Sequence, residues 1–336
     1  GEILVIHPGA LGDLLEAVPA LVALRALREG TRLALAAQPR LADFLRGAGV
    51  ADEALSFDGL ALETLFGGDS VSPAVKARLA RFDRVVSWFG SRADHFADRL
   101  RAIVPEALVE PPVPETGPPP TVWEHLLETL APWGVKAPSP PVLLTPPEAW
   151  RAEARLALSR LGRDNRRPLL FVHPGAGGRD KRWPAANFAE VIRRVAGETG
   201  CQVLIHQGPA DRDAVDQLTR ALDLTALSMV EPPLHRLAGA LQEAGAYLGA
   251  DSGVSHLAAA VGAPSVILFP PATHGRWTPW SPTAIPLAMP RDPIEVGTVV
   301  RTVMEPGRAC RTASPPRAAV ERRRPPSRER RDRRSA

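Results

Sequence analysis

The sequence lacks the features that mark several protein classes. Its two cysteines, Cys201 and Cys310, are too far apart for a disulfide framework and have no metal-ligand spacing, which fits a reducing cytoplasm. No run of about 18 apolar residues is present that would be long enough for a membrane-spanning helix. The first residues lack the basic start and the cleavage site of a secretory signal peptide. We therefore expect a cytoplasmic protein.

Several nucleotide and metal motifs are also missing. The pattern GxxxxGK[ST] does not occur, and no GxGxxG follows the first strand, which disfavours P-loop enzymes and dehydrogenases. One D-x-D triplet, residues 211–213, falls where a helix begins, so helix capping explains it better than a metal site. No cofactor is indicated, and no Ser-His-Asp order or Cys-His pairing supports a covalent mechanism.

Positive charge is concentrated at the C-terminal end. Residues 308–336 hold 11 arginines against 3 acidic residues and almost no apolar side chain, which predicts a disordered tail. Since the whole chain carries +4, the other 307 residues carry −4, and this argues against a nucleic-acid-binding body. The tail is expected either to contact anionic lipid head groups or polyphosphate, or to be a solvated terminus without function.

What the sequence does contain is a long alternation of strand and helix patterns. Pro19 should kink the helix predicted for 14–28, and the Pro-rich segment 105–120 should be an extended surface segment rather than a core element. The alternation indicates an α/β protein with doubly wound parallel sheets. Apolar runs of strand length are predicted at 2–7, 31–36, 53–57, 84–88, 168–172, 202–206, 247–249 and 265–269.

A length of 336 residues is enough for two such domains. We expect them at 1–145 and 146–307, followed by the tail at 308–336. The tetrapeptide HPGA follows the opening strand of each half, at 7–10 and again at 173–176, which suggests two similar domains facing one another. Ligands of doubly wound sheets sit beyond the carboxyl ends of the strands, so a ligand is expected in the cleft between the domains.

Residues 247–269 read as strand, turn, helix, turn and strand. Ser252 can cap the helix, whose free N–H groups and dipole suit a phosphate or another anion. Asp251 stands beside this anion site, where a carboxylate could take sugar hydroxyls. Capping alone explains the same residues equally well, and His256 either reaches back to the anion site or simply packs.

Two further places could carry chemistry. Asp13 opens the first helix and is either a helix cap or a general base that points into the cleft. The Gly-rich loop 175–183 lets backbone approach a ligand closely. In that loop Lys181 and Arg182 are either cations for a leaving diphosphate or solvated surface charges.

Taken together, these motifs resemble glycosyltransferase family 9, which contains the bacterial lipopolysaccharide heptosyltransferases and their relatives. The resemblance covers roughly residues 2–305 and rests on GALGDLLEAVPAL, HPGAGGRDKRWP, and GADSGVSHLAAAVGAPSVILF with the W-x-P that follows. It implies a GT-B fold, which is two facing Rossmann-like domains with an interdomain cleft. It also implies an inverting reaction without a metal, an acceptor on the N-terminal domain, and a nucleotide-sugar, typically ADP-heptose, on the C-terminal domain.

The resemblance also implies roles for single residues. Asp13 is expected to be the catalytic base and Lys181 to contact the donor phosphates. Asp251 would hold the sugar, and Asp211 rather than Asp213 would hold the ribose. The other expected donor-binding residues are Gly175, Ser252, Gly253 and His256. The expected acceptor-binding residues are Gly12, Lys76 and Arg78, although few cations lie in region 58–81, which argues against a strongly anionic acceptor.

We therefore expect a monomeric glycosyltransferase that moves a sugar, heptose from ADP-heptose, onto a lipopolysaccharide-core or other cell-envelope glycan. Peripheral contact with the cytoplasmic face of the inner membrane would suit that acceptor. The alternatives are a nucleotide-sugar epimerase of the same architecture and a non-catalytic nucleotide-sugar-binding relative.

Overall fold

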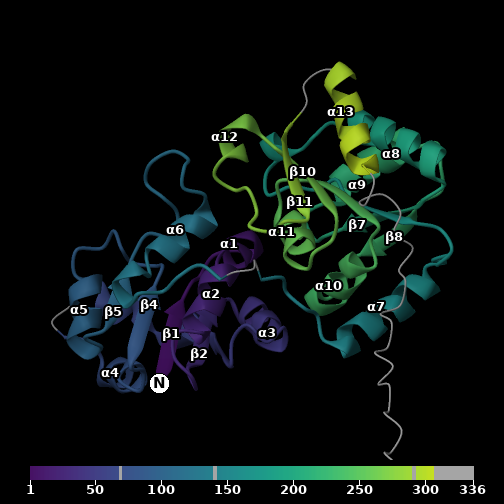
Figure 1. Ribbon diagram of the computed structural model, residues 1–336. Helices are drawn as coiled ribbons and strands as arrows, with labels where there is room; N and C mark the ends of the chain where they lie inside the picture. Colours follow the sequence, from purple (N-terminus) through teal and green to yellow (C-terminus); the bar gives the residue numbers. More distant parts are fainter. Residues whose placement is uncertain (68–69, 139–141, 290–292, 306–336) are drawn as a thin grey trace, which may run out of the picture.

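The computed structural model describes residues 1–67, 70–138, 142–289 and 293–305. The tail predicted for 308–336, together with Cys310, lies outside these residues. The described part of the chain forms two layered α/β units, each built on one parallel sheet with helices against it (Figure 1). No helix in this part is long and apolar enough to cross a membrane.

The first sheet has the strand order β3-β2-β1-β4-β5, with all pairs parallel. The strands β1 and β2 bury nearly every side chain, which is why they read as continuous apolar runs. The strands are β1 Glu2–Ile6, β2 Arg32–Ala37, β3 Glu53–Ser56, β4 Arg84–Ser87 and β5 Ala107–Val109. The helices are α1 Leu11–Glu16, α2 Val18–Arg25, α3 Pro39–Gly47, α4 Pro73–Leu79, α5 Phe96–Ile103 and α6 Val122–Glu128. Short 3-10 helices cover Asp58–Leu60, Leu62–Leu65 and Ala131–Trp133.

The second sheet has the strand order β11-β10-β9-β6-β7-β8, again with all pairs parallel. Its central strands β6, β9 and β10 are buried along their whole length. The strands are β6 Leu169–His173, β7 Gln202–Gln207, β8 Leu227–Val230, β9 Ala246–Ala250, β10 Ser265–Phe269 and β11 Ala284–Ala288. The helices are α7 Glu148–Arg160, α8 Ala185–Thr199, α9 Arg212–Ala221, α10 Leu234–Gln242, α11 Gly253–Ala260, α12 Pro271–His274 and α13 Pro293–Met304, with a 3-10 helix at Arg179–Lys181.

Both sheets are wound in the same way. In the first sheet the chain starts at β1, winds outward to β3 and returns to β4 on the other side; in the second it starts at β6, winds outward to β8 and returns to β9. The strand order therefore reverses between β1 and β4 and between β6 and β9. Ligands of such sheets bind beyond the carboxyl ends of the strands at these switch points. The two HPGA segments lie at equivalent places, because His7 directly follows β1 and His173 ends β6.

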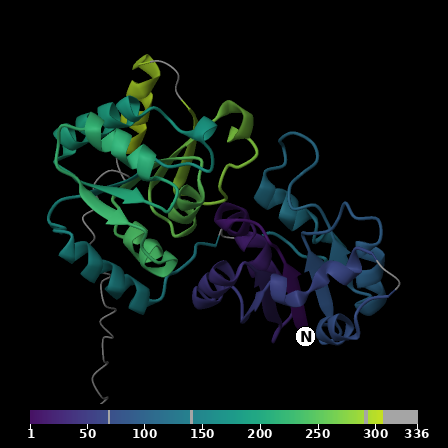
Figure 2. The ribbon, with the colours of Figure 1, turned by 180° about the vertical axis from the view of Figure 1, so that it is seen from behind.

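The two units touch where α1 and α11 begin, and both views show these helices side by side (Figure 2). A Cβ on Gly253 would lie 3.1 Å from Leu11 Cβ, and a Cβ on Gly12 would lie 3.3 Å from His256 Cδ2. Glycine at both positions lets the two helix starts approach closely. The side chain of Trp280 adds a third tie, because its Nε1 donates a hydrogen bond to the carbonyl of Leu15 in α1 at 3.1 Å.

Three predictions of local structure need correction. The helix predicted for 14–28 begins earlier and is broken rather than kinked: α1 ends at Glu16, and α2 starts at Val18 with Pro19 in its first turn. The segment 105–120 is not all surface, because β5 extends the first sheet and buries Ala107 and Val109. The sequence predicts a loop at 273–282, but its first two residues belong to the short helix α12. Neither α5 nor β8 has a counterpart among the predicted elements.

Candidate functional site

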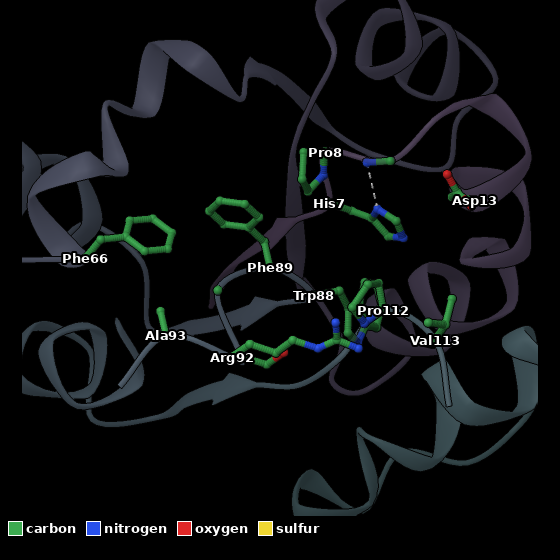
Figure 3. Close-up of a pocket in the computed structure, with 13 residues that line it drawn as sticks. His7, Pro8, Asp13, Phe66, Trp88, Phe89, Arg92, Ala93, Pro112 and Val113 are labelled. Carbon is green, nitrogen blue, oxygen red and sulfur yellow. Dashed lines mark hydrogen bonds between the residues drawn. The ribbon is translucent and has the colours of Figure 1, made fainter. Parts of the chain in front are cut away.

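The first switch point opens into a cavity of about 610 Å³. The lining comes from the loop after β1 and the start of α1, from the chain after β4, from the end of the 3-10 helix Leu62–Leu65, and from the chain after β5 (Figure 3). Most of the side chains in the lining are apolar, among them three aromatic rings and two prolines. The charged side chains among the described lining residues are Asp13 and Arg92. The lining includes His7, Pro8, Asp13, Phe66, Trp88 and Phe89, together with Arg92, Pro112 and Val113.

Asp13 is held in this cavity by the start of α1. It is the third residue of the helix, and its Oδ2 accepts a hydrogen bond from the Ala10 N–H at 2.7 Å. Asp13 is therefore not the helix cap itself, since Ala10 occupies that position, but its carboxylate satisfies a backbone donor left free at the helix start. Gly9 makes room for it, because a Cβ there would lie 2.7 Å from both Asp13 Cβ and His7 Cε1.

His7 lies at the base of the same cavity and is neutral. Burial lowers its pKa to about 4, against an opposing effect of Asp13. Its Nδ1 accepts a hydrogen bond from the Gly9 N–H at 3.2 Å, so the ring proton sits on Nε2. That Nε2 is buried and has no hydrogen-bond partner among the described residues. A buried donor without a hydrogen bond destabilises the fold, so an acceptor oxygen placed beside this nitrogen would bind favourably.

The second switch point carries an ion pair in place of an apolar cavity. Asp251 follows β9 directly, and its Oδ2 accepts hydrogen bonds from Lys181 Nζ at 3.0 Å and from Thr273 Oγ1 at 3.1 Å. Burial alone would raise the pKa of Asp251, but His256 and Lys181 more than offset this and lower it. The carboxylate is therefore ionised while buried, and Lys181 remains one-third exposed beside it.

His256 connects this ion pair to the first unit. Its Nε2 lies 3.8 Å from Asp251 Oδ1, and its Nδ1 lies 2.8 Å from Oε1 of Glu16, a residue of α1. Burial alone would lower the pKa of His256, but the two carboxylates outweigh it and raise the pKa to about 9. The imidazolium is thus held between one carboxylate from each unit, close to the contact between α1 and α11.

Ser252 caps α11, as predicted. Its Oγ accepts a hydrogen bond from the Ser255 N–H at 3.2 Å. Ser255 in turn donates to the Ala250 carbonyl at 2.6 Å, which ties the turn to the end of β9. The N–H groups of Gly253 and its neighbours therefore begin a helix that starts beside both Asp251 and the first unit.

A match to a family model covers residues 116–293, more than half of the chain, and the model describes glycosyltransferase family 9 (heptosyltransferase). The chain belongs to glycosyltransferase family 9. The resemblance that the sequence motifs predict is thereby confirmed.

Single relatives of this family match parts of the chain. Lipopolysaccharide heptosyltransferase 3 of Escherichia coli is 30% identical over 171 residues, which are 48% of this chain and 47% of that protein. The chain spans less than half the length of the curated relatives that it matches first. These local matches support membership in family 9.

Solved structures of family 9 proteins match nearly the whole chain. A glycosyl transferase family 9 protein from Veillonella parvula superposes with a TM-score of 0.70 at 19% identity, covering 91% of this chain and 90% of that one. ADP-heptose lps heptosyltransferase II of E. coli superposes with a TM-score of 0.67 at 19% identity, covering 90% and 97%. The chain therefore has the GT-B fold, as predicted.

The Gly-rich loop of this family 9 chain lies over Asp211, the predicted ribose ligand. A Cβ on Gly175 would lie 2.1 Å from Asp211 Oδ1, so glycine is required there. Asp211 is nearly buried, and its Oδ2 accepts from the Gly208 N–H at 3.1 Å. Asp213, the less favoured residue, pairs with Arg182 Nη1 at 3.1 Å and lines a separate cavity of about 310 Å³.

Two buried histidines lie beneath the same loop. Nδ1 of His206 and Nδ1 of His173 are 3.0 Å apart, and His173 Nε2 lies 3.8 Å from Asp211 Oδ2. Burial lowers the pKa of His173 to about 4 and that of His206 to about 3. Both rings are therefore neutral, and the Nδ1–H of one of them donates a hydrogen bond to the Nδ1 of the other. In the described part of the chain, no cluster of three or more His, Cys, Asp or Glu side chains could hold a metal ion.

The predicted acceptor-binding residues do not come together with Asp13. Lys76 on α4 lines a different cavity, and Arg78 on the same helix donates a hydrogen bond to the Leu60 carbonyl at 2.9 Å. Gly12 lies against α11 rather than in the lining of the Asp13 cavity. Asp13 instead shares its cavity with Phe66, Trp88 and Phe89, which are not among the predicted site residues.

Sequence reasoning also missed Glu16, whose role depends on its partner in the other unit. Glu16 is 1% exposed although it is charged, and it stands between the apolar residues Leu15 and Ala17. A glutamate among the apolar positions of a helix was the available signal. Trp88 and Phe89 could have been found as the residues that directly follow β4, the strand across the switch point from β1.

Proposed function

We propose that this family 9 chain is a glycosyltransferase that moves a sugar from a nucleotide-sugar onto a hydroxyl of its acceptor. One observation carries the proposal: Asp13 and the Lys181–Asp251 pair occupy the switch points of two sheets whose helices α1 and α11 start against each other. The first unit, taken as residues 1–145, would bind the acceptor. The second, taken as residues 146–307, would bind the donor, and the chain would act as a cytoplasmic monomer.

The names of similar proteins support heptose, carried by ADP-heptose, as the sugar. One E. coli relative is a lipopolysaccharide heptosyltransferase, and the similar E. coli structure is that of an ADP-heptose lps heptosyltransferase. By the same likeness, the acceptor would be a glycan of the cell envelope, such as the lipopolysaccharide core.

In the proposed reaction Asp13 takes the proton of the acceptor hydroxyl. The oxygen attacks the anomeric carbon from the face opposite the leaving group, so a new glycosidic bond forms as the bond to the diphosphate breaks, and the configuration inverts. Asp13 suits this role because one of its oxygens is anchored by the Ala10 N–H, which fixes the carboxylate at the cavity wall. The electron pair leaves with the nucleoside diphosphate.

The leaving diphosphate would be stabilised by the second unit without a metal ion. Lys181 supplies a cation at the switch point, and the N–H groups at Ser252 and Gly253 supply the positive end of α11. Asp251 would hold the sugar hydroxyls. The charged ring of His256, whose Nε2 lies 3.8 Å from Asp251 Oδ1, would keep this carboxylate in place.

A transfer assay with ADP-heptose and candidate envelope acceptors tests the proposal, with Asp13→Asn beside the wild type. We expect turnover to fall by roughly 10²–10⁴-fold, the usual contribution of a positioned general base, while ADP-heptose still binds. Full turnover by Asp13→Asn would show that Asp13 is not the base. Product formed from the nucleotide-sugar alone would show an epimerase, and binding without turnover over every acceptor would show a non-catalytic relative.

A further inference from the structure

We propose that the cavity at the first switch point takes an uncharged acceptor that presents a flat apolar ring beside its reacting hydroxyl. This inference rests on the proposed function, because it assumes that the cavity beside Asp13 is the acceptor site. It keeps the proposed sugar transfer but favours, from the lining of this cavity, an acceptor of different chemistry from the glycan that likeness to the relatives suggests.

The first support is the composition of the wall. Three aromatic side chains line the cavity, Pro8 adds an apolar surface after β1, and Pro112 and Val113 add one after β5. Phe66 and Phe89 meet edge to face with centroids 5.4 Å apart, and Phe57, outside the lining, packs against Phe89 at 4.9 Å. Trp88 instead meets the ring of His7, with centroids 5.7 Å apart. Such a wall favours an apolar ring, because aromatic pairs gain energy beyond the area that they bury.

The second support is the exposure of Phe66. It is 40% exposed, and few other large apolar side chains in the described part of the chain are exposed to this degree. Figure 3 shows Phe66 and Phe89 at one end of the cavity and Asp13 at the other, with His7 between them. A ring placed against Phe66 and Phe89 would therefore leave its hydroxyl on the side of His7 and Asp13.

The third support is the distribution of charge. Asp13 and Arg92 are the charged side chains of this lining in the described part of the chain, and His7 is neutral. The one cation is matched by one carboxylate, so an acceptor with several negative charges would enter an apolar site without compensation. The two cations predicted to bind the acceptor, Lys76 and Arg78, lie at other places.

The fourth support is the free donor on His7. Its protonated Nε2 is buried in the residue that forms the base of the cavity, and it has no partner within the described chain. A hydroxyl or ether oxygen of a neutral acceptor would satisfy it. The cavity thus offers an apolar wall at one end and one donor and one carboxylate at the other, which matches a ring that carries a hydroxyl.

A binding measurement on the full chain tests this inference without depending on turnover. The reference probe is phenyl β-glucoside. Methyl β-glucoside lacks its apolar ring, and phenyl β-glucuronide adds a carboxylate to it. Binding is followed by titration calorimetry. We expect the phenyl glucoside to bind about tenfold more tightly than either of the others, given the area of one buried ring.

Variants then locate the binding. Phe66→Ala should remove most of the preference for phenyl over methyl glucoside. Leu156→Ala, which changes an exposed apolar residue on α7 in the second unit, is the matched control and should leave the preference unchanged. Equal affinity for all three probes, tighter binding of the glucuronide, or a preference that survives Phe66→Ala would overturn the inference.

The failure of this inference and the failure of the proposed function are distinguishable. Sugar transfer to anionic acceptors with no preference for the phenyl ring would overturn the inference and leave the glycosyltransferase proposal standing. Selective binding of the phenyl glucoside with no transfer from any nucleotide-sugar would support the cavity as a binding site and count against the glycosyltransferase.

Discussion

The two switch points share a winding and a tetrapeptide but differ in chemistry. At the first, β4 continues into Trp88 and Phe89, and the site is apolar with a single anchored carboxylate. At the second, β9 continues into Asp251 and Ser252, and the site is a chain of charges. The residues that follow the strand across the switch, rather than the shared HPGA loop, therefore set the chemistry of each switch point.

The histidines of the two switch points show the same contrast. Burial lowers the pKa of His7 to about 4, so it is neutral near pH 7. His256 is equally buried, but Glu16 and Asp251 face it and raise its pKa to about 9. Burial disfavours the charged form of both rings, and the charge of each depends on whether its charged neighbours outweigh burial.

The largest expected effect falls on the first switch point. Asp13→Asn should lower turnover by roughly 10²–10⁴-fold, because an amide cannot take the proton of the acceptor hydroxyl. The affinity for the nucleotide-sugar should stay within about twofold of the wild type, since the proposed donor site lies on the other unit. Steady-state kinetics together with calorimetry separate the two effects. Normal turnover by Asp13→Asn would contradict the proposal that Asp13 is the base at the first switch point.

A somewhat smaller effect is expected at the second switch point. Lys181→Ala should lower turnover with ADP-heptose by roughly 10²–10³-fold and weaken donor binding, because it removes a cation placed for the leaving diphosphate. Lys76→Ala is the matched control, since this lysine lies on α4 and lines another cavity. Loss of acceptor affinity in Lys76→Ala would instead restore that residue to the acceptor site and break the comparison.

The link between the two halves should show itself in the pH dependence of stability. The pKa of His256 is raised to about 9 in the folded chain, above its usual 6.5. The resulting stabilisation is fully present below pH 6.5 and is lost as pH rises through about 9. Its size is on the order of 1–3 kcal/mol. Glu16→Gln removes one facing carboxylate, so urea unfolding between pH 6 and 10 should show a smaller decline.

The titration of His256 by NMR checks the same prediction without unfolding the protein. In Glu16→Gln the pKa of His256 should fall from about 9 toward its usual value. An unchanged pKa would mean that the contact of Nδ1 with Glu16 Oε1 does not charge the imidazole. In that case the link between the two units would be one of packing alone.

The smallest effect is expected for the neutral histidine of the first switch point. The pKa of His7 is lowered to about 4, so its contribution to stability is complete above pH 6.5 and is lost as pH falls through about 4. His7→Gln cannot titrate, so the variant should lose less stability than the wild type between pH 6.5 and 4. Identical acid unfolding profiles for the two proteins would contradict a buried neutral His7.

Most of the fold is predictable because its strands are continuous apolar runs between helical patterns. The central strands β1, β2, β6 and β10 are fully or nearly fully buried, and burial on both faces produces that signal. β5 has three residues within a Pro- and Glu-rich segment, and β8 has exposed residues at alternate positions. Short edge strands like these are defined by pairing with a neighbour, which the local sequence does not record.

The candidate site also contains residues that the local sequence indicates and residues that only the fold brings together. Asp13, Lys181 and Asp251 could be proposed from the sequence because each follows a strand or lies in a Gly-rich loop. The ring wall of Phe66 and Phe89 could not, because it joins segments that only the folded sheet brings together. Lys76 and Arg78 were chosen for their charge, and the direction in which α4 presents them depends on packing.

Titration of ADP-heptose into the wild type, Asp13→Asn and Lys181→Ala tests the central claim most directly. We predict that Asp13→Asn binds the donor as the wild type does, within about twofold, and that Lys181→Ala binds it at least about tenfold more weakly. Equal weakening in both variants, or normal binding by Lys181→Ala, would contradict the assignment of donor and acceptor to separate switch points.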